Sequence, residues 1–259
     1  MLALAQFAVR LICGMSLVLT AMPRAAVASG FFRVQMLIVM GLGVLAVLAD
    51  QTAPLNSEIS SWMPQVHWGL SLVLAVLGFI ASVFWTLERR KGAANLLLLI
   101  ALISMLALGL GIVLAQPKQW QTHWGLIFAS DFSSALTLGG AMCGMLLGHS
   151  YLTSPTMSIS PLFRLNEFLG WAGVARGVIS AIVLCLAWSH LQDESVWTWL
   201  VLRWIAGVFG PIMVWQMVQR ILAFRNTQAA TGVLFVGVIL TLLGELTGTL
   251  LLTATGYPL

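Results

Sequence analysis

Four ionisable residues stand inside long apolar segments of this 259-residue sequence, where a charge is costly: Arg10, Asp131, Arg203 and Glu245. Charged side chains in such segments usually pair with one another, or they line a path for protons, ions or a polar ligand. A carboxylate beside a guanidinium can exchange a proton with a ligand or hold the polar head of a quinone. The same residues can instead form ion pairs that only hold helices together.

The elements that position these residues are apolar helices. The sequence is 60% hydrophobic and only 8% charged, whereas soluble domains are about 45–50% apolar and about 25% charged. A run of about 18 or more apolar residues predicts a membrane-spanning helix. Seven of the predicted helices cover about residues 3–22, 34–49, 66–87, 94–115, 168–190, 196–219 and 231–252. The fifth begins between residues 124 and 132 and ends near residue 151, and Asp131 shares the depth of the other ionisable residues if this helix starts at Trp124. We therefore expect an all-α, polytopic bundle of about eight transmembrane helices, with residues 1–259 forming a single transmembrane domain.

Basic residues predict the topology of these spans. The loops after the first, third, fifth and seventh helices hold eight basic residues: Arg24, Arg33, Arg89, Arg90, Lys91, Arg164, Arg220 and Arg225. The opposite loops hold only Lys118. The positive-inside rule then places both termini outside the cytoplasm, in a multi-pass protein of a cell membrane such as a bacterial inner membrane. A signal peptide that ends near residue 28 is the alternative interpretation of the first segment.

Depth along the helices brings the four ionisable residues into one layer near the outer face, at about 1.5 Å of rise per residue. The last two helices are antiparallel neighbours, so Arg203 and Glu245 form the predicted pair. Gly244 and Gly248 make a small-xxx-small pattern that lets another helix approach this face. Arg176 falls about 12 Å from the inner end of its predicted helix, and we expect its long side chain to reach toward the inner surface.

Two histidines are candidate cofactor ligands. His67 and His123 occupy equivalent positions in two similar stretches, residues 65–70 and 121–126. Haem b can be ligated by two imidazoles that face each other, but neither histidine lies in the middle of a span, so we expect no haem. The three cysteines lie apart in apolar segments, without a Cys-x-x-Cys motif, so no metal site is expected.

Two short segments near the end of the chain carry a resemblance to a known family. Residues 242–248, Leu-Leu-Gly-Glu-Leu-Thr-Gly, resemble the Gly-Glu-Leu-x-Gly stretch in the last helix of the membrane anchor subunit of dimethyl sulfoxide reductase and of polysulfide-reductase-type membrane subunits. Leu202-Arg203-Trp204 resembles an Arg-bearing stretch of the preceding helix. The resemblance covers about the last quarter of the chain, and Thr249 stands where the family pattern often has Arg.

The resemblance implies a membrane anchor for a peripheral redox module outside the membrane. Such a subunit exchanges electrons and protons with quinol near the outer face, and it is at most a non-catalytic subunit of an oxidoreductase. Glu245 would then accept or donate the proton, and Arg203 would position the quinone headgroup. The implied partners are the lipid bilayer and a peripheral or membrane partner subunit.

Other functions remain open. A transporter or channel could use the same polar layer as its path. A lipid-handling enzyme could use His190 with Asp193 and Glu194, and an accessory subunit would need no chemistry of its own. No basic face is interleaved with exposed aromatic residues, so nucleic acid is not an expected partner.

Overall fold

The computed structural model describes residues 2–51, 62–115, 124–153, 157–188 and 194–258. Within these ranges the regular structure is helical throughout, and eight helices are long and apolar enough to cross a membrane. The predicted all-α, multi-pass membrane bundle is thus confirmed, while the side on which the termini lie stays a prediction. The chain divides into two compact units, Met1–Gln121 and Thr122–Leu259, which we call the N-terminal and C-terminal units.

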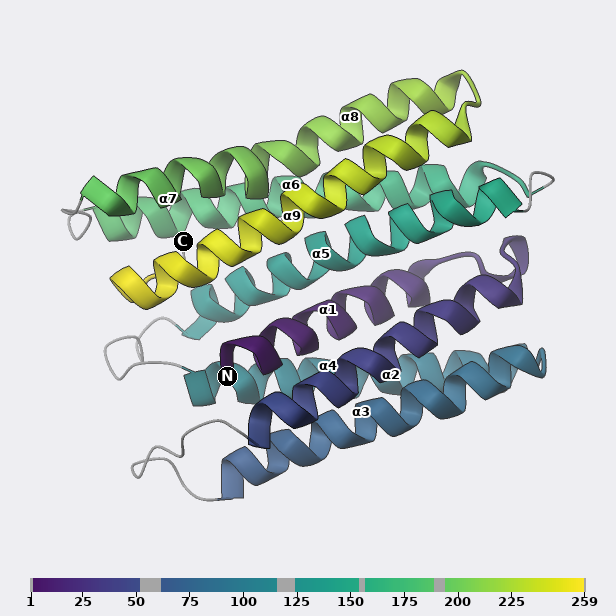
Figure 1. Cartoon of the computed structure of the whole chain (residues 1–259), viewed down its shortest axis with the longest axis horizontal. Coiled ribbons are helices and arrows are strands. Elements are labelled where there is room, and N and C mark those ends of the chain that lie inside the picture. Colours follow the sequence, from purple (N-terminus) through teal and green to yellow (C-terminus); the bar gives the residue numbers. More distant parts are fainter. Residues whose placement is uncertain (1, 52–61, 116–123, 154–156, 189–193, 259) are drawn as a thin grey trace. The chain divides into compact units, whose positions relative to one another are not determined.

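The N-terminal unit is a bundle of long helices (Figure 1). Its elements are α1 (Leu2–Ala21), the 3-10 turn η1 (Arg24–Ala26), α2 (Ser29–Gln51), α3 (Trp62–Thr86) and α4 (Arg90–Ala115). Helix α1 packs against α2 and α4, and its residues Ala8, Ile12 and Leu19 are fully buried. This packing makes α1 an integral part of the unit.

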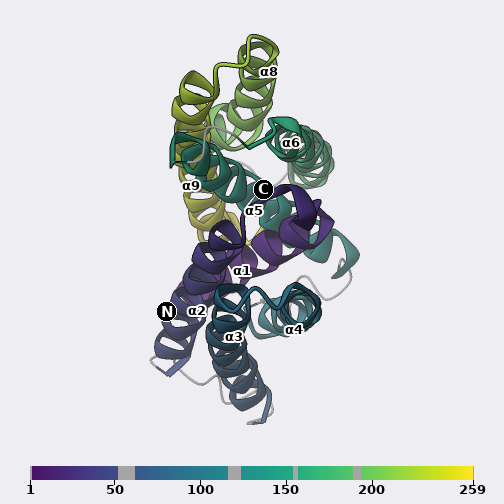
Figure 2. The same ribbon diagram turned by 90° about the vertical axis from the view of Figure 1, so that its right-hand side faces the viewer.

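Small residues bring α2 and α3 together along their length, and the two helices lie side by side in Figure 2. A Cβ atom on Gly43 would lie 2.7 Å from the backbone nitrogen of Ala75, and one on Gly78 would lie 2.8 Å from that of Met40. Close backbone contact through small residues is a common way for helices to associate in membranes, where apolar burial gives no advantage over lipid.

The C-terminal unit contains four spans, one of which is irregular. Its elements are α5 (Trp124–Thr153), α6 (Ser160–Ala187), α7 (Glu194–Trp204), the π-helical segment η4 (Ile205–Phe209), α8 (Gly210–Ala223) and α9 (Thr227–Thr255). Helices α7 and α8, with η4 between them, form one continuous span. Pro211 has no backbone N–H and cannot continue an ordinary ladder of hydrogen bonds. The irregularity lies immediately before Gly210 and Pro211, as the π-helical turn η4.

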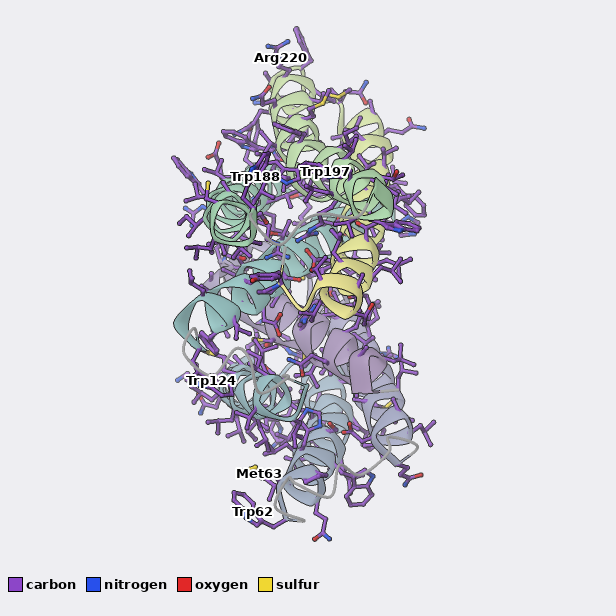
Figure 3. All side chains as sticks on the ribbon, turned by 90° about the vertical axis from the view of Figure 1, so that its left-hand side faces the viewer. Trp62, Met63, Trp124, Trp188, Trp197 and Arg220 are labelled. Atoms are coloured by element: carbon purple, nitrogen blue, oxygen red, sulfur yellow. The ribbon has the colours of Figure 1, made fainter. Side chains whose placement is uncertain are left out.

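Tryptophans mark several helix ends, an arrangement typical of the membrane–water interface. Trp188, just after α6, and Trp197, at the start of α7, lie together at one end of the C-terminal unit (Figure 3), with ring centroids 5.4 Å apart. Trp62 and Trp124 begin α3 and α5 and are exposed. Such rings pack their apolar body against lipid tails while the indole N–H meets water or headgroups.

Candidate functional site

The carboxylate of Glu245 is the centre of a buried polar cluster in the C-terminal unit. Arg203 of α7 donates from Nη1 to Glu245 Oε1 at 3.0 Å, and the Nε atom of Arg176, on α6, lies 3.3 Å from the same oxygen. Ser134 of α5 donates to Glu245 Oε2 at 2.5 Å. Four helices therefore meet at one side chain of α9, and the predicted pairing of Arg203 with Glu245 is confirmed.

Two glycines allow Arg203 to reach Glu245. A Cβ atom on Gly207 would stand 2.6 Å from Arg203 Nη1, and one on Gly244 would stand 2.2 Å from the Cα atom of Gly207. The backbones of η4 and α9 thus touch immediately beside the ion pair. Segments of π-helix inside α-helices often occur at functional sites, and this one begins two residues after Arg203.

Arg176 belongs to the same cluster, so the expectation that it reaches toward the inner surface is wrong. The physical reason is the start of α6, which begins at Ser160 with Pro161 in its first turn, several residues before the predicted start. Proline favours the first turn of a helix because that turn leaves its N–H groups unpaired. At about 1.5 Å per residue, Arg176 then lies roughly 24 Å from this end of α6, at the level of Glu245.

A serine on α5 connects Arg176 to the C-terminal segment. Arg176 Nη1 donates to the backbone oxygen of Ser130 at 2.9 Å and contacts its Oγ atom at 2.7 Å. The Ser130 hydroxyl in turn donates to the backbone oxygen of Pro258 at 3.1 Å. The polar contacts therefore continue from Glu245 through Arg176 and Ser130 to Pro258, three residues after the end of α9.

The cluster is nearly inaccessible to solvent. Arg203 is 0% exposed, and Arg176 and Glu245 are each 3% exposed. Removing such charges from water is costly, and their mutual attraction offsets that cost only when the geometry is good and further hydrogen bonds are made. Ser134 and Ser130 make such bonds. Chemically, the arrangement can hold one carboxylate between two guanidiniums, with a hydroxyl group in position to pass a proton to it.

Asp131 and Arg10, the other two residues of the predicted layer, lie one in each unit. Asp131 is on α5, next to Ser130, and is 7% exposed. Arg10 is half-buried on α1 of the N-terminal unit. The part of the Glu245 cluster described above is built from side chains of the C-terminal unit alone.

His67 lies in a second buried polar group, in the N-terminal unit. Its Nδ1 atom is 2.8 Å from Asp50 Oδ2, and the hydroxyl of Ser71 donates to the same oxygen at 3.4 Å. The sequence placed Asp50 in a loop, but α2 continues to Gln51 and carries Asp50 into contact with α3. The sequence did not predict the imidazole–carboxylate pair, because the predicted second helix ended before Asp50.

Helix α4 passes close to His67 Nε2, on the side where a haem iron would bind. A Cβ atom on Gly111 of α4 would lie 3.1 Å from His67 Nε2 and closer still to the Oε1 atom of Gln6. A haem iron bound to Nε2 would need its macrocycle where this helix passes. His123, the other candidate ligand, lies outside the described residues, as do His190 and Asp193. The absence of haem remains a prediction, which the position of Gly111 supports.

Within the described ranges, no group of three or more His, Cys, Asp or Glu side chains is placed to hold a metal ion. Comparison of the chain with protein families, with curated proteins and with solved structures finds no match. The resemblance to quinol-interacting anchor subunits therefore rests on the two short segments around Arg203 and Glu245.

Proposed function

We propose that this chain is a membrane subunit of a redox complex and that it exchanges protons with quinol at Glu245. The observation that carries the proposal is the convergence of Arg203, Arg176 and Ser134 on the carboxylate of Glu245. Ionisable groups buried in transmembrane helices are commonly parts of proton relays. Quinol oxidation releases protons, so a buried carboxylate with fixed hydrogen-bond partners is a suitable acceptor.

Each member of the cluster has a distinct part in this proposal. Glu245 takes the proton that leaves the quinol hydroxyl, and Arg203 and Arg176 hold its carboxylate in one orientation. Ser134 passes the proton between the ligand and Glu245 Oε2. A partner subunit that carries the redox centre takes the electrons, because the chain has short loops and leaves little room for a catalytic domain. The resemblance of residues 242–248 to anchor subunits supports the same assignment.

The burial of the cluster favours a second candidate function, a structural accessory subunit. A carboxylate that is 3% exposed and bonded on both oxygens can also serve only to fix four helices. Buried ion pairs of this kind are often structural. The two functions differ in whether a quinone binds beside Glu245.

The decisive experiment is quinone binding by the purified chain in detergent. A short-tailed quinol analogue should bind the wild-type chain. Glu245→Gln should raise its dissociation constant at least about tenfold, which corresponds to a loss of about 1.4 kcal/mol of binding free energy. Glu167→Gln is a control, because Glu167 is a half-buried carboxylate of the same unit and bonds Gln219 rather than the cluster. Equal affinity of folded wild-type and Glu245→Gln chains would leave the structural role as the function.

A further inference from the structure

A cavity at the other end of the C-terminal unit is separate from the Glu245 cluster. It lies where α5 and α8 end and where α6 and α9 begin, and its volume is about 930 Å³. Its lining includes Tyr151, Ser158, Ser160, Phe163, Arg225 and Thr227. Thr227 and Glu245 are at distant positions of α9, roughly 27 Å apart at about 1.5 Å per residue. Small-molecule sites usually have volumes of about 300–1,000 Å³, so this cavity is large enough for a ligand.

The electrostatics of the cavity favour an anion. Arg225 is the charged residue among the described lining residues, and none of them is acidic. The two long helices α6 and α9 both begin at this cavity, at Ser160 and Thr227. The helix dipole gives these two N-termini partial positive charge, which favours a negatively charged ligand, while most of their first N–H groups already donate to oxygens of the preceding turns. The Asn226 side chain caps the N–H of Ala229.

Arg225 is held in a backbone conformation that ordinarily favours glycine. Its φ angle is 56°, in the left-handed region, where a side chain with a Cβ atom is strained. Glycine or asparagine is usual at this position after a helix, and Arg225 closes the turn by donating its N–H to Leu222 O at 2.9 Å. Strain at a non-glycine residue suggests that its side chain has a function, and here that side chain lines the cavity.

The rest of the lining combines hydroxyl groups with apolar side chains, a mixture that suits an amphiphile. Met157, Phe163 and Leu222 contribute to the wall. The apolar spans of this unit begin or end at Leu152, at Ser160 and at Ala223, so the cavity lies at the boundary between apolar helix and polar surroundings. In a bilayer this is the level of the lipid headgroups. Basic pockets between helices at this level are suited to anionic lipid headgroups.

We propose that this cavity binds the phosphate headgroup of an anionic phospholipid. Arg225 contacts the phosphate near the positive ends of the α6 and α9 helix dipoles, while Phe163 and its apolar neighbours contact the glycerol and acyl region. The positive-inside rule assigns this end of the unit to the cytoplasmic side, so the lipid belongs to the inner leaflet. This site is independent of any quinol chemistry at Glu245.

The test is thermal unfolding of the delipidated, purified chain in neutral detergent. Phosphatidylglycerol added to the micelles should raise the Tm by about 3 °C or more, and phosphatidylcholine should have a clearly smaller effect. Arg225→Gly removes the charge and also the left-handed strain, so its Tm without lipid should not fall, but the shift with phosphatidylglycerol should be lost. Arg225→Asn, which also tolerates this conformation, serves if the glycine variant does not fold.

Arg220→Gln is the matched control, because Arg220 is exposed at the end of α8, outside the cavity lining, and projects away from the ribbon (Figure 3). This variant should keep the full shift. A shift that survives in Arg225→Gly would overturn the proposal, as would an equal shift with phosphatidylcholine or the absence of a shift in the wild-type chain. An equal shift with inorganic phosphate would show that the site takes a free anion and would also overturn it.

Discussion

Gly207 and Gly244 are in backbone contact, since a Cβ atom on Gly244 would stand 2.2 Å from the Cα atom of Gly207. This contact sets the distance between η4 and α9 beside the Arg203–Glu245 pair. We predict that Gly244→Ala forces the two helices apart and destabilises the chain by about 1–3 kcal/mol, the usual cost of overpacking. Thermal or denaturant unfolding in detergent measures the change.

Gly232→Ala is the control for this prediction, on the same helix. No described atom lies within 4 Å of a Cβ atom placed there, so alanine should leave stability unchanged or increase it by up to about 1 kcal/mol. Equal stability of the two variants would mean that the close contact is not what fixes the helices.

Removing charges from the Glu245 cluster should have unequal effects. Arg203→Gln leaves Glu245 with Arg176 and Ser134, whereas Glu245→Gln takes the carboxylate from two guanidiniums. We therefore expect Glu245→Gln to cost more, about 3–5 kcal/mol. The double variant should be more stable than the sum of the two single effects predicts, by about 0.5–3 kcal/mol. Additive losses in unfolding experiments would contradict the coupling.

The same double variant separates the two candidate functions. If the pair only holds helices together, Arg203→Gln with Glu245→Gln should recover the activity measured with its partner along with stability. If Glu245 accepts protons, the double variant should fold but show impaired quinone binding or turnover with its partner, because the carboxylate is missing.

Topology is testable with reporter fusions. We expect reporters after Leu259 or in residues 51–65 to lie outside the cytoplasm, and reporters in residues 88–91 or 220–228 to lie inside. A cytoplasmic C-terminus would contradict the arrangement. N-terminal sequencing should find a mature chain that still contains α1, because α1 packs against α2 and α4.

The Asp50–His67 pair should stabilise the N-terminal unit. Asp50→Asn weakens a hydrogen bond to a buried imidazole that is 2.8 Å long, and bonds to charged groups contribute about 1.5–3 kcal/mol. Ser71→Ala should cost less, since its contact with Asp50 is 3.4 Å long. Unfolding experiments in detergent measure the stability of both variants. A larger loss of stability in Ser71→Ala than in Asp50→Asn would show that the Asp50–His67 pair contributes little.

The purified chain should carry no stoichiometric haem b. The helix at Gly111 passes in front of His67 Nε2, which leaves little room for a macrocycle. An absorption spectrum with a Soret band at one haem per chain, lost in His67→Ala, would contradict this prediction and would strengthen an electron-transfer role.

The eight spans and the Arg203–Glu245 pair could be predicted because both depend on positions along single helices. Hydropathy locates each span, and the distance of a residue from a helix end gives its depth. Arg176 and Asp50 were misplaced because the predicted helix boundaries near them were wrong. Helix α6 begins earlier than predicted, and α2 ends later than predicted. Ser134 had no sequence signal, because serine is common in transmembrane helices.

The π-helical turn of η4 also sets the rotation of α8 relative to α7 about the axis of their common span. A π turn closes hydrogen bonds one residue later than an α turn, and one residue corresponds to about 100° of rotation about an α-helix axis. If this segment became α-helix without losing a residue, α8 would therefore turn relative to α7 by about this angle, whereas deletion of one residue at the same time would keep the phase. In the first case Arg203 would keep its direction, but Trp215 would leave the surface of Gly170 against which it packs.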